Sequence, residues 1–337
     1  MASQSGVSAI SSPELILMRD SRLGLSMAAS WSWGASAAVG IGILLSRGQT
    51  AFLIWTVGNI LAVPLFGFIY TQWPSLRSMI DLRAVIVPMV AIQVFAYWIN
   101  MQAAYEAATG GIDIETVGFA SSSVAVGGAI AVALALSLFI YRTGLPGSIT
   151  TDIGQFSVQV AACVGIVVLG IALGTPAQTI PLTTSQDVSW GLWAAVGLLS
   201  GPFLDAQHWQ RLERASSARP AMWAGGWFGG YMLAVWGAGL VLSRSTPLLS
   251  VLFLAVVVAI ATSTIDSAAA ALQRLTTRRT ALGVGVVAAV SWPLVRSIGV
   301  VDLWTLYAST RVFVVCGLLL YAAFSTRSGL PILVGKV

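Results

Sequence analysis

Ten apolar stretches, separated by short loops, constrain this chain more than any other feature of its sequence. They comprise residues 24–46, 51–71, 84–105, 121–141, 153–174, 189–209, 221–243, 247–273, 281–301 and 303–325. An α-helix of about twenty residues crosses the ~30 Å hydrocarbon core of a bilayer. Because lipid offers no hydrogen-bonding partner, a spanning segment must pair its own backbone groups, as a helix does. We therefore predict an all-α integral membrane protein with ten transmembrane helices.

The composition excludes several other classes of protein. Hydrophobic residues make up 57% of the chain and charged residues only 9%, against about a quarter charged in soluble domains. The net charge of +5 comes from arginines scattered among loops, so no nucleic-acid partner is expected. Cys163 and Cys316 lie in apolar runs, which argues against a disulfide framework or a redox pair. The single histidine, His208, excludes a multi-histidine metal centre.

Positive charge is distributed unevenly between the two sides of the predicted helices. With the N-terminus inside, thirteen arginines and lysines, Arg211 among them, fall in inward segments and three in outward loops, while Arg311 falls within the last helix. This asymmetry predicts that both termini are cytoplasmic, in a bacterial inner membrane. Residues 1–23 are polar and lack the apolar core of a cleavable signal peptide. We expect them to form a cytoplasmic N-terminal segment, and residues 326–337 a cytoplasmic C-terminal tail.

Ten helices divide into two halves of five, residues 24–174 and 189–325. Five is odd, so a repeated second half would be inverted in the membrane, and transporters of that design bind their ligands where helices are broken near the bilayer centre. Residues 30–36 and 199–205 are rich in helix-weakening residues at matching positions in the two halves. Gly201 and Pro202 lower the free-energy cost of an unwound turn there, although an ordinary proline kink is the alternative. We predict a 5+5 inverted repeat with discontinuous helices 1 and 6.

The predicted helix 247–273 contains an unusual polar run. One carboxylate and four hydroxyls occur within six residues, at Thr262, Ser263, Thr264, Asp266 and Ser267. Such groups are costly in hydrocarbon unless they face a cavity, a partner or an ion. Hydroxyl and carbonyl oxygens are hard ligands, of the kind that suits Na⁺. The alternative is that the hydroxyls bond back to helix backbones, and Asp266 itself could bind an ion or be structural.

Four patches resemble motifs of the sodium:solute symporter family. Residues 263–267 are similar to its S-T-A-D-S run, residues 151–155 to its T-D-x-x-Q pattern, and residues 207–211 to its Q-R ending. The stretch from Ala29-Ser30-Trp31 to Gly58-Asn59 is also similar to the family's first two helices. The resemblance covers nearly the whole chain and implies a LeuT-type fold. Members usually have thirteen or more helices and an alanine where this chain has Ile265, and the residues that sugar-transporting relatives use are absent.

The resemblance also implies where a cation binds. In the family a Na⁺ lies between helices 1 and 8, and the matching positions are the hydroxyls of Ser263 and Thr264 with the carbonyls of Ile260, Ser30 and Trp33. Asp152 would serve a second cation site or cation release, and its alternative role is a helix N-cap. Apart from this coupling ion, no cofactor is expected.

The candidate substrate-binding residues lie on helices 1, 3 and 6. Gln93, Tyr97 and Asn100 are spaced i, i+4, i+7 and so share one helix face. Tryptophans of helix 1 could stack on a flat, apolar or cationic solute, or belong to an interfacial belt. The full set is Trp31, Ser32, Gln93, Tyr97, Asn100, Phe203 and Asp205.

These observations predict a secondary active transporter rather than an enzyme. It would couple Na⁺ to symport of a small organic solute by alternating access, with the solute, Na⁺ and the lipid bilayer as its partners. One alternative is a nucleobase–cation symporter-like protein of the same fold, which Gly58-Asn59 and the tryptophans would suit. A transport-derived sensor without transport activity is another. An intramembrane hydrolase is disfavoured because His208 has no serine partner nearby in the sequence.

Overall fold

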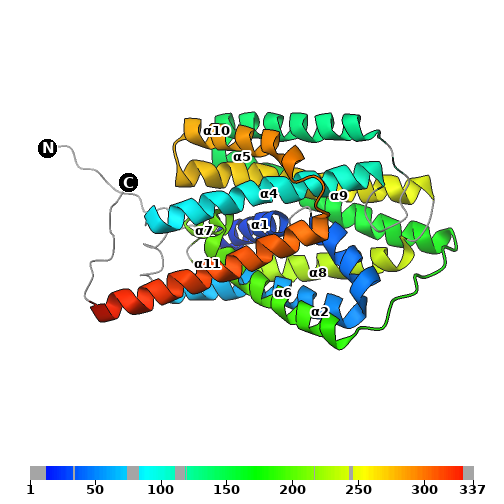
Figure 1. Cartoon of the computed structure of the whole chain (residues 1–337), viewed down its shortest axis with the longest axis horizontal. Helices are drawn as coiled ribbons and strands as arrows, with labels where there is room; N and C mark the ends of the chain where they lie inside the picture. The colour runs from blue at the N-terminus through cyan, green and yellow to red at the C-terminus, as the bar shows by residue number, and fades with distance from the viewer. Residues whose placement is uncertain are drawn as a thin grey trace.

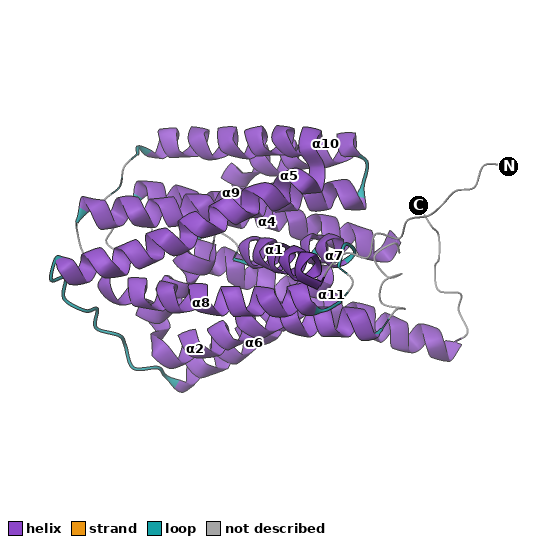
Figure 2. Cartoon of the chain, turned by 180° about the vertical axis from the view of Figure 1, so that it is seen from behind, coloured by secondary structure: helices purple, strands orange, loops and turns teal. Residues whose placement is uncertain are grey.

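The chain is almost entirely helical, as predicted (Figure 2). The computed structural model describes residues 13–32, 35–73, 83–110, 118, 120–215, 217–242 and 246–328. Within these residues there are ten α-helices, one short 3₁₀-helix and no strand. The helices are α1 (Pro13–Trp31), α2 (Ala35–Gln72), α4 (Arg83–Thr109), α5 (Ser122–Ala172), α6 (Ser185–Leu204), α7 (Ala206–Leu212), α8 (Arg219–Val241), α9 (Pro247–Leu275), α10 (Arg278–Ser291), η2 (Trp292–Leu294) and α11 (Val300–Ser328).

Helix α1 lies in the middle of the bundle, and the other helices run alongside it (Figure 1). It packs against α8, α5, α9 and the short α7. Met27, Ala28 and Ala29 on α1 are fully buried. Small side chains let helices approach closely, which is how helices associate in a membrane. The central position of α1 places its end, at Trp31, deep inside the protein.

Two of the helices are hairpins that reverse at a glycine. The 51 residues of α5 would extend ~76 Å as one straight helix, far more than a bilayer core. Gly144 interrupts α5 with a φ of 63°, a left-handed conformation that suits glycine. Ile140, just before it, accepts a hydrogen bond from Gln273 near the end of α9. Val124 and Gly165, further along in either direction, both lie beside the first half of α9.

Because both ends of α5 lie towards the start of α9 and its middle lies at the end of α9, the chain turns back at Gly144. Gly48, with a φ of 83°, interrupts α2 in the same way. A Cβ at Gly48 would collide with the Pro181 carbonyl and the Thr183 hydroxyl. Glycine is therefore required at this turn for space as well as for its backbone angles.

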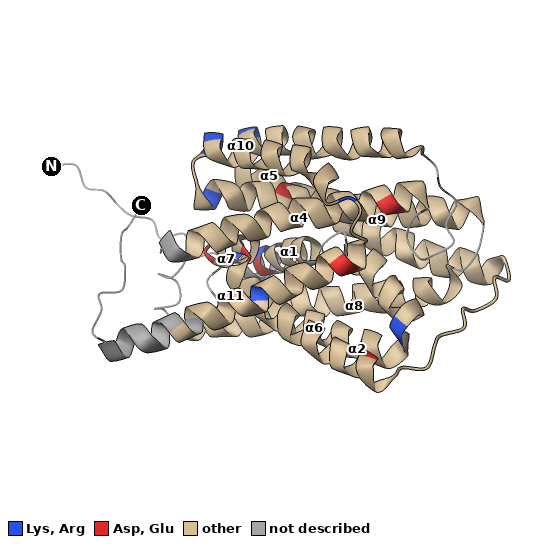
Figure 3. Ribbon diagram, viewed as in Figure 1, with Lys and Arg blue, Asp and Glu red and all other residues tan. Residues whose placement is uncertain are grey.

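The outer face of the bundle is apolar. Leu53, Val57 and Leu61 on α2 recur every four residues and are about half exposed, which is the pattern of a lipid-facing stripe. Most of the ribbon carries no charge (Figure 3). Among the described residues, α2, α4, α5, α9 and α11 each contain a stretch long and apolar enough to cross a bilayer. The chain is a multi-pass integral membrane protein.

The helix of residues 189–209 is interrupted at Asp205, the last residue of the predicted segment 199–205, and not at Gly201 and Pro202. Gly201 and Pro202 lie inside α6, and the extended residue between α6 and α7 is Asp205, with φ −98° and ψ 98°. Its Oδ1 accepts a hydrogen bond from the Gln207 backbone N–H at 3.1 Å, so the carboxylate caps α7. A Cβ at Gly201 would collide with Arg311 and Trp31. Gly201 thus provides close packing rather than an unwound turn.

Three other boundaries differ from the sequence prediction. Helix α1 begins at Pro13, well before residue 24, and its Asp20 is buried. Helix α10 ends at Ser291, and Pro293 lies in the following 3₁₀-helix, where its ring does not have to fit an α-helix interior. Arg211, expected in an inward loop, lies inside α7 and is buried. The apolar run ends at Trp209, but the helix continues for another turn.

Candidate functional site

Asp152 is the centre of a buried polar cluster that joins four helices. From α5, its carboxylate accepts hydrogen bonds from Ser26 of α1 at 2.5 Å and from Ser263 of α9 at 2.7 Å. Arg211 of α7 donates to the same carboxylate at 2.7 Å. All four side chains are buried. Asp152 lies inside α5, well after Gly144, so it does not act as the helix N-cap that the sequence left open.

A second carboxylate, Asp266 of α9, extends this cluster. It accepts hydrogen bonds from Thr151 at 2.6 Å and from Ser148 at 3.0 Å. Arg211 also donates to Ser267 at 2.7 Å, and Ser267 and Ser148 are 3.1 Å apart. We call this group the Asp152 cluster: Ser26, Ser148, Thr151, Asp152, Arg211, Ser263, Asp266 and Ser267.

Of the residues expected to bind a cation, Ser263 belongs to the Asp152 cluster and Thr264 follows it on α9. Thr264 is buried, and its hydroxyl has no hydrogen-bond partner among the described residues. Ser263 donates its one proton to Asp152, which leaves the lone pairs of its oxygen available. Ser30 donates to the Met27 carbonyl at 3.1 Å, and Ile260 is buried on α9. Trp33 lies outside the described residues.

A separate polar group surrounds the interruption between α6 and α7. Gln93 of α4 donates to Asp205 at 3.2 Å and accepts from Gln207 at 3.0 Å. His208 has its Nε2 3.8 Å from the Asp205 carboxylate, and its ring lies edge-on to Trp31 at 5.2 Å. All five side chains are buried. The structure therefore brings together Gln93 and Asp205, two of the predicted substrate residues.

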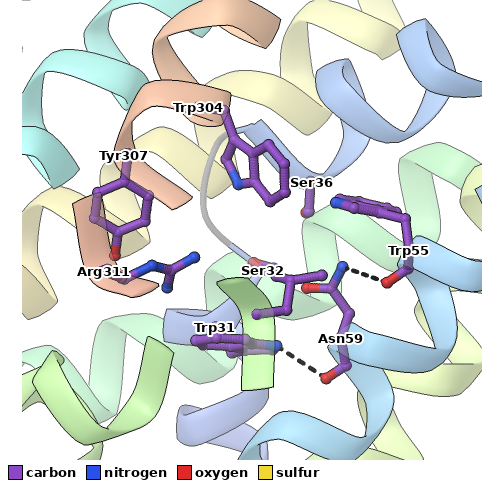
Figure 4. Close-up of a pocket in the computed structure, with 9 residues that line it drawn as sticks. Trp31, Ser32, Ser36, Trp55, Asn59, Trp304, Tyr307 and Arg311 are labelled. Atoms are coloured by element: carbon purple, nitrogen blue, oxygen red, sulfur yellow. Dashed lines mark hydrogen bonds between the residues drawn. The ribbon is translucent and has the colours of Figure 1, made fainter. Parts of the chain in front are cut away.

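A small cavity lies beyond Trp31, where α1, α2, α6 and α11 meet (Figure 4). The indole N–H of Trp31 donates to the Asn59 carbonyl at 3.0 Å, which fixes one wall. The cavity offers about 10 Å³ to the centre of a water molecule, which is room for about one water. Its lining residues are Trp31, Ser32, Ser36, Trp55, Asn59, Leu198, Trp304, Tyr307 and Arg311.

Three predicted substrate residues lie elsewhere. Tyr97 is hydrogen-bonded to Ser137 of α5 at 2.7 Å. Asn100 donates to the Ala96 carbonyl at 2.6 Å and faces an apolar groove between α4, α5 and α9. Phe203 packs edge-on against Phe66 at 5.2 Å. The i, i+4, i+7 spacing fixed a shared helix face but not which neighbouring helix each side chain meets.

Sequence reasoning missed two arginines of this region. Arg311 lines the cavity and Arg211 holds the Asp152 cluster together. An arginine within an apolar span is a signal that could have identified Arg311, because such a residue is rare and faces the protein interior. Arg211 stands in the Q-R ending of residues 207–211, but it follows the apolar run and was counted with the charges of the inward segments.

Comparison with known proteins identifies a solved structure with a similar fold. No protein-family model matches the chain, and no curated protein matches it in sequence. A solved structure does match, described as the substrate-bound, outward-open state of a Na⁺-coupled sialic acid symporter with a novel Na⁺ site. The TM-score is 0.53 at 13% identity, over 86% of this chain and 75% of that one. The chain has the fold of that symporter. This is a LeuT-type fold, as the sequence motifs implied, and the neighbour is a transporter rather than an enzyme.

Proposed function

We propose that this protein is a secondary active transporter of the sodium:solute symporter family, which uses Na⁺ to drive uptake of a small organic solute. The observation that carries the proposal is the Asp152 cluster, which joins α1, α5, α7 and α9 in the fold of a Na⁺-coupled symporter. In this reading α1 and the start of α2 form a first discontinuous helix, and α6 with α7 form the sixth. Counting α2 and α5 as hairpins then gives ten crossings in two inverted halves.

The cation site that we propose lies between α1 and α9. Its ligands are the hydroxyls of Ser263 and Thr264 and the carbonyls of Ile260, Ser30 and Trp33. The buried hydroxyl of Thr264, which has no hydrogen-bond partner in the described part of the chain, supports this assignment, because a polar group in a dry interior is costly unless it is satisfied. The Asp152 carboxylate also lies beside this site, because Ser263 donates to it at 2.7 Å.

Helix α1 is the element that would couple the cation to the solute. Ser26 bonds to Asp152 in the cluster, and Trp31 and Ser32 line the cavity. These positions are five or six residues apart, ~8 Å along a helix. A cation that fixes α1 against α9 thereby fixes the cavity wall. Such coupling is reciprocal, so solute and Na⁺ raise each other's affinity by the same factor.

The proposal includes an orientation. Arg274, Arg278 and Arg279 lie at the end of α9 and the start of α10, which the positive-inside rule places in the cytoplasm. Asp152 then lies in the cytoplasmic half of the membrane, on the route by which a released cation would leave. The cavity at Trp31 lies further towards the outside.

The experiment that tests the function is uptake into proteoliposomes. Purified protein is reconstituted, an inward Na⁺ gradient is imposed, and uptake is screened across a panel of radiolabelled small solutes. We expect at least one solute to accumulate above its external concentration, and to leak out again when the gradient is collapsed with an ionophore. Equal uptake under an inward K⁺ gradient would contradict Na⁺ coupling. Empty liposomes supply the background for each solute.

A further inference from the structure

The cavity beyond Trp31 contains one charged side chain among its nine lining residues. Arg311 of α11 is 1% exposed, and its guanidinium extends past Tyr307 towards Ser32 (Figure 4). Gly201 of α6 lies directly against it, where any side chain would collide with the guanidinium. The fold thus keeps space for a positive charge in the wall of a chamber that four aromatic residues help to line.

The surroundings of this arginine fix its position. Its guanidinium carbon lies 4.0 Å from the centre of the Tyr307 ring and 5.9 Å from that of Trp31. Cation–π contacts of this kind hold a guanidinium by its flat faces. The N–H groups at its edge form a fork that matches a carboxylate, with two parallel hydrogen bonds. The guanidinium beside these two rings is therefore the group of the chamber that suits an anion.

The other lining residues agree with an anionic ligand. Ser36 and Asn59 carry groups that can donate hydrogen bonds, and the described residues that line the chamber include no carboxylate. Trp31, Trp55 and Trp304 would alone suit either an apolar body or a cation. A cation is disfavoured because the Arg311 guanidinium would repel it at close range in a medium of low dielectric.

We propose that the transported solute is a small organic carboxylate and that Arg311 is its counter-ion, with the three tryptophans contacting its apolar part. This proposal rests on the proposed transport function and names its substrate class. Co-transport with one Na⁺ then carries no net charge for a monocarboxylate. The chamber has room for about one water in this conformation, so its walls move apart when the solute enters.

The test compares carboxylates with neutral molecules of the same shape. Purified protein in detergent at constant Na⁺ is titrated with acetate, pyruvate and benzoate, and separately with acetamide, pyruvamide and benzamide, while its thermal unfolding is followed. We expect at least one carboxylate to raise Tm with a saturable dose response and its amide to bind about tenfold more weakly or worse. Equal responses to acid and amide, or no response to any of the three acids, would overturn the proposal.

Two substitutions assign the response to Arg311. In Arg311→Gln the carboxylate response is expected to be lost, and Arg311→Lys is expected to retain part of it, since an ammonium keeps the charge but not the fork. An undiminished response in Arg311→Gln would overturn the role of this residue. The comparison of acids with amides on the unaltered protein stands even if a variant fails to fold. Na⁺-dependent stabilisation measured without any carboxylate reports on the cation site alone. If Na⁺ stabilises the protein but no carboxylate does, the substrate class is wrong; if Na⁺ does not stabilise it either, the proposed function is wrong.

Discussion

Arg211 and Asp152 form an ion pair that is completely buried, with the arginine Nη2 2.7 Å from the aspartate Oδ2. The pair joins the short helix α7, which follows the interruption at Asp205, to the long hairpin α5. Taking two charges out of water is costly, and the pair offsets that cost only while both partners and their hydrogen bonds are present. The position of α7 in the bundle therefore depends on this contact.

Removing one partner of the pair should be strongly destabilising. Asp152→Asn leaves the Arg211 guanidinium buried without its carboxylate, and we expect a loss of about 3–5 kcal/mol. The double variant Asp152→Asn/Arg211→Gln removes both charges and should recover part of that loss. Thermal unfolding of the purified variants in one detergent measures both effects. A double variant no more stable than the single one would contradict the assignment of the cost to an unpaired charge.

An exposed ion pair at the ends of α7 and α9 provides the contrast. Arg274 of α9 and Glu213, just after α7, are 2.9 Å apart, but their side chains are 36% and 34% exposed. Water screens such a pair, which is worth about 0–1 kcal/mol. Glu213→Gln should therefore change Tm far less than Asp152→Asn in the same assay. A loss of Tm as large as that caused by Asp152→Asn would mean that burial does not determine how much an ion pair contributes to stability.

The packing around Gly201 gives a third prediction. Gly201→Ala places a methyl group against Arg311 and Trp31, and the overpacking should cost about 1–3 kcal/mol. Solute binding should weaken as well, because the guanidinium has to move. Gly230→Ala on α8 is the control, since nothing lies within 4 Å of a Cβ there. Binding that is equally strong in both variants would remove Arg311 from the solute site.

The orientation can be tested without a substrate. The thirteen-to-three distribution of arginine and lysine predicts that the C-terminus is cytoplasmic. Because Arg211 is buried in α7, it no longer counts among the thirteen inward charges, but the asymmetry between the two sides remains. A reporter that is active only in the cytoplasm should give signal when fused after residue 337. Signal only from a periplasmic reporter would reverse the proposed direction of transport.

Sequence periodicity located the helices well because each apolar stretch has to match the thickness of a bilayer. The interruption fell within the predicted segment 199–205, but it was assigned to Gly201 and Pro202, the usual helix breakers, rather than to Asp205. The periodicity grouped Gln93 with Tyr97 on one helix face, yet Gln93 meets Asp205 and Tyr97 meets Ser137. Those contacts depend on which helices are neighbours in space. The partner of Asp152 was missed for the same reason, since Arg211 is 59 residues away along the chain.

The measurement that tests the central claim most directly is the Na⁺ dependence of thermal stability in Ser263→Ala/Thr264→Ala. The two hydroxyls are proposed ligands of the cation, and replacing them leaves the apolar packing of α9 nearly unchanged. The control is Thr262→Ala, whose hydroxyl bonds back to the Val258 carbonyl at 2.9 Å. Stability gained from a ligand follows the occupancy of its site. The account predicts that Na⁺, but not K⁺, raises the Tm of the unaltered protein and of the control, and that the double variant folds but no longer responds. A double variant with the full Na⁺ response would contradict a Na⁺ site between α1 and α9.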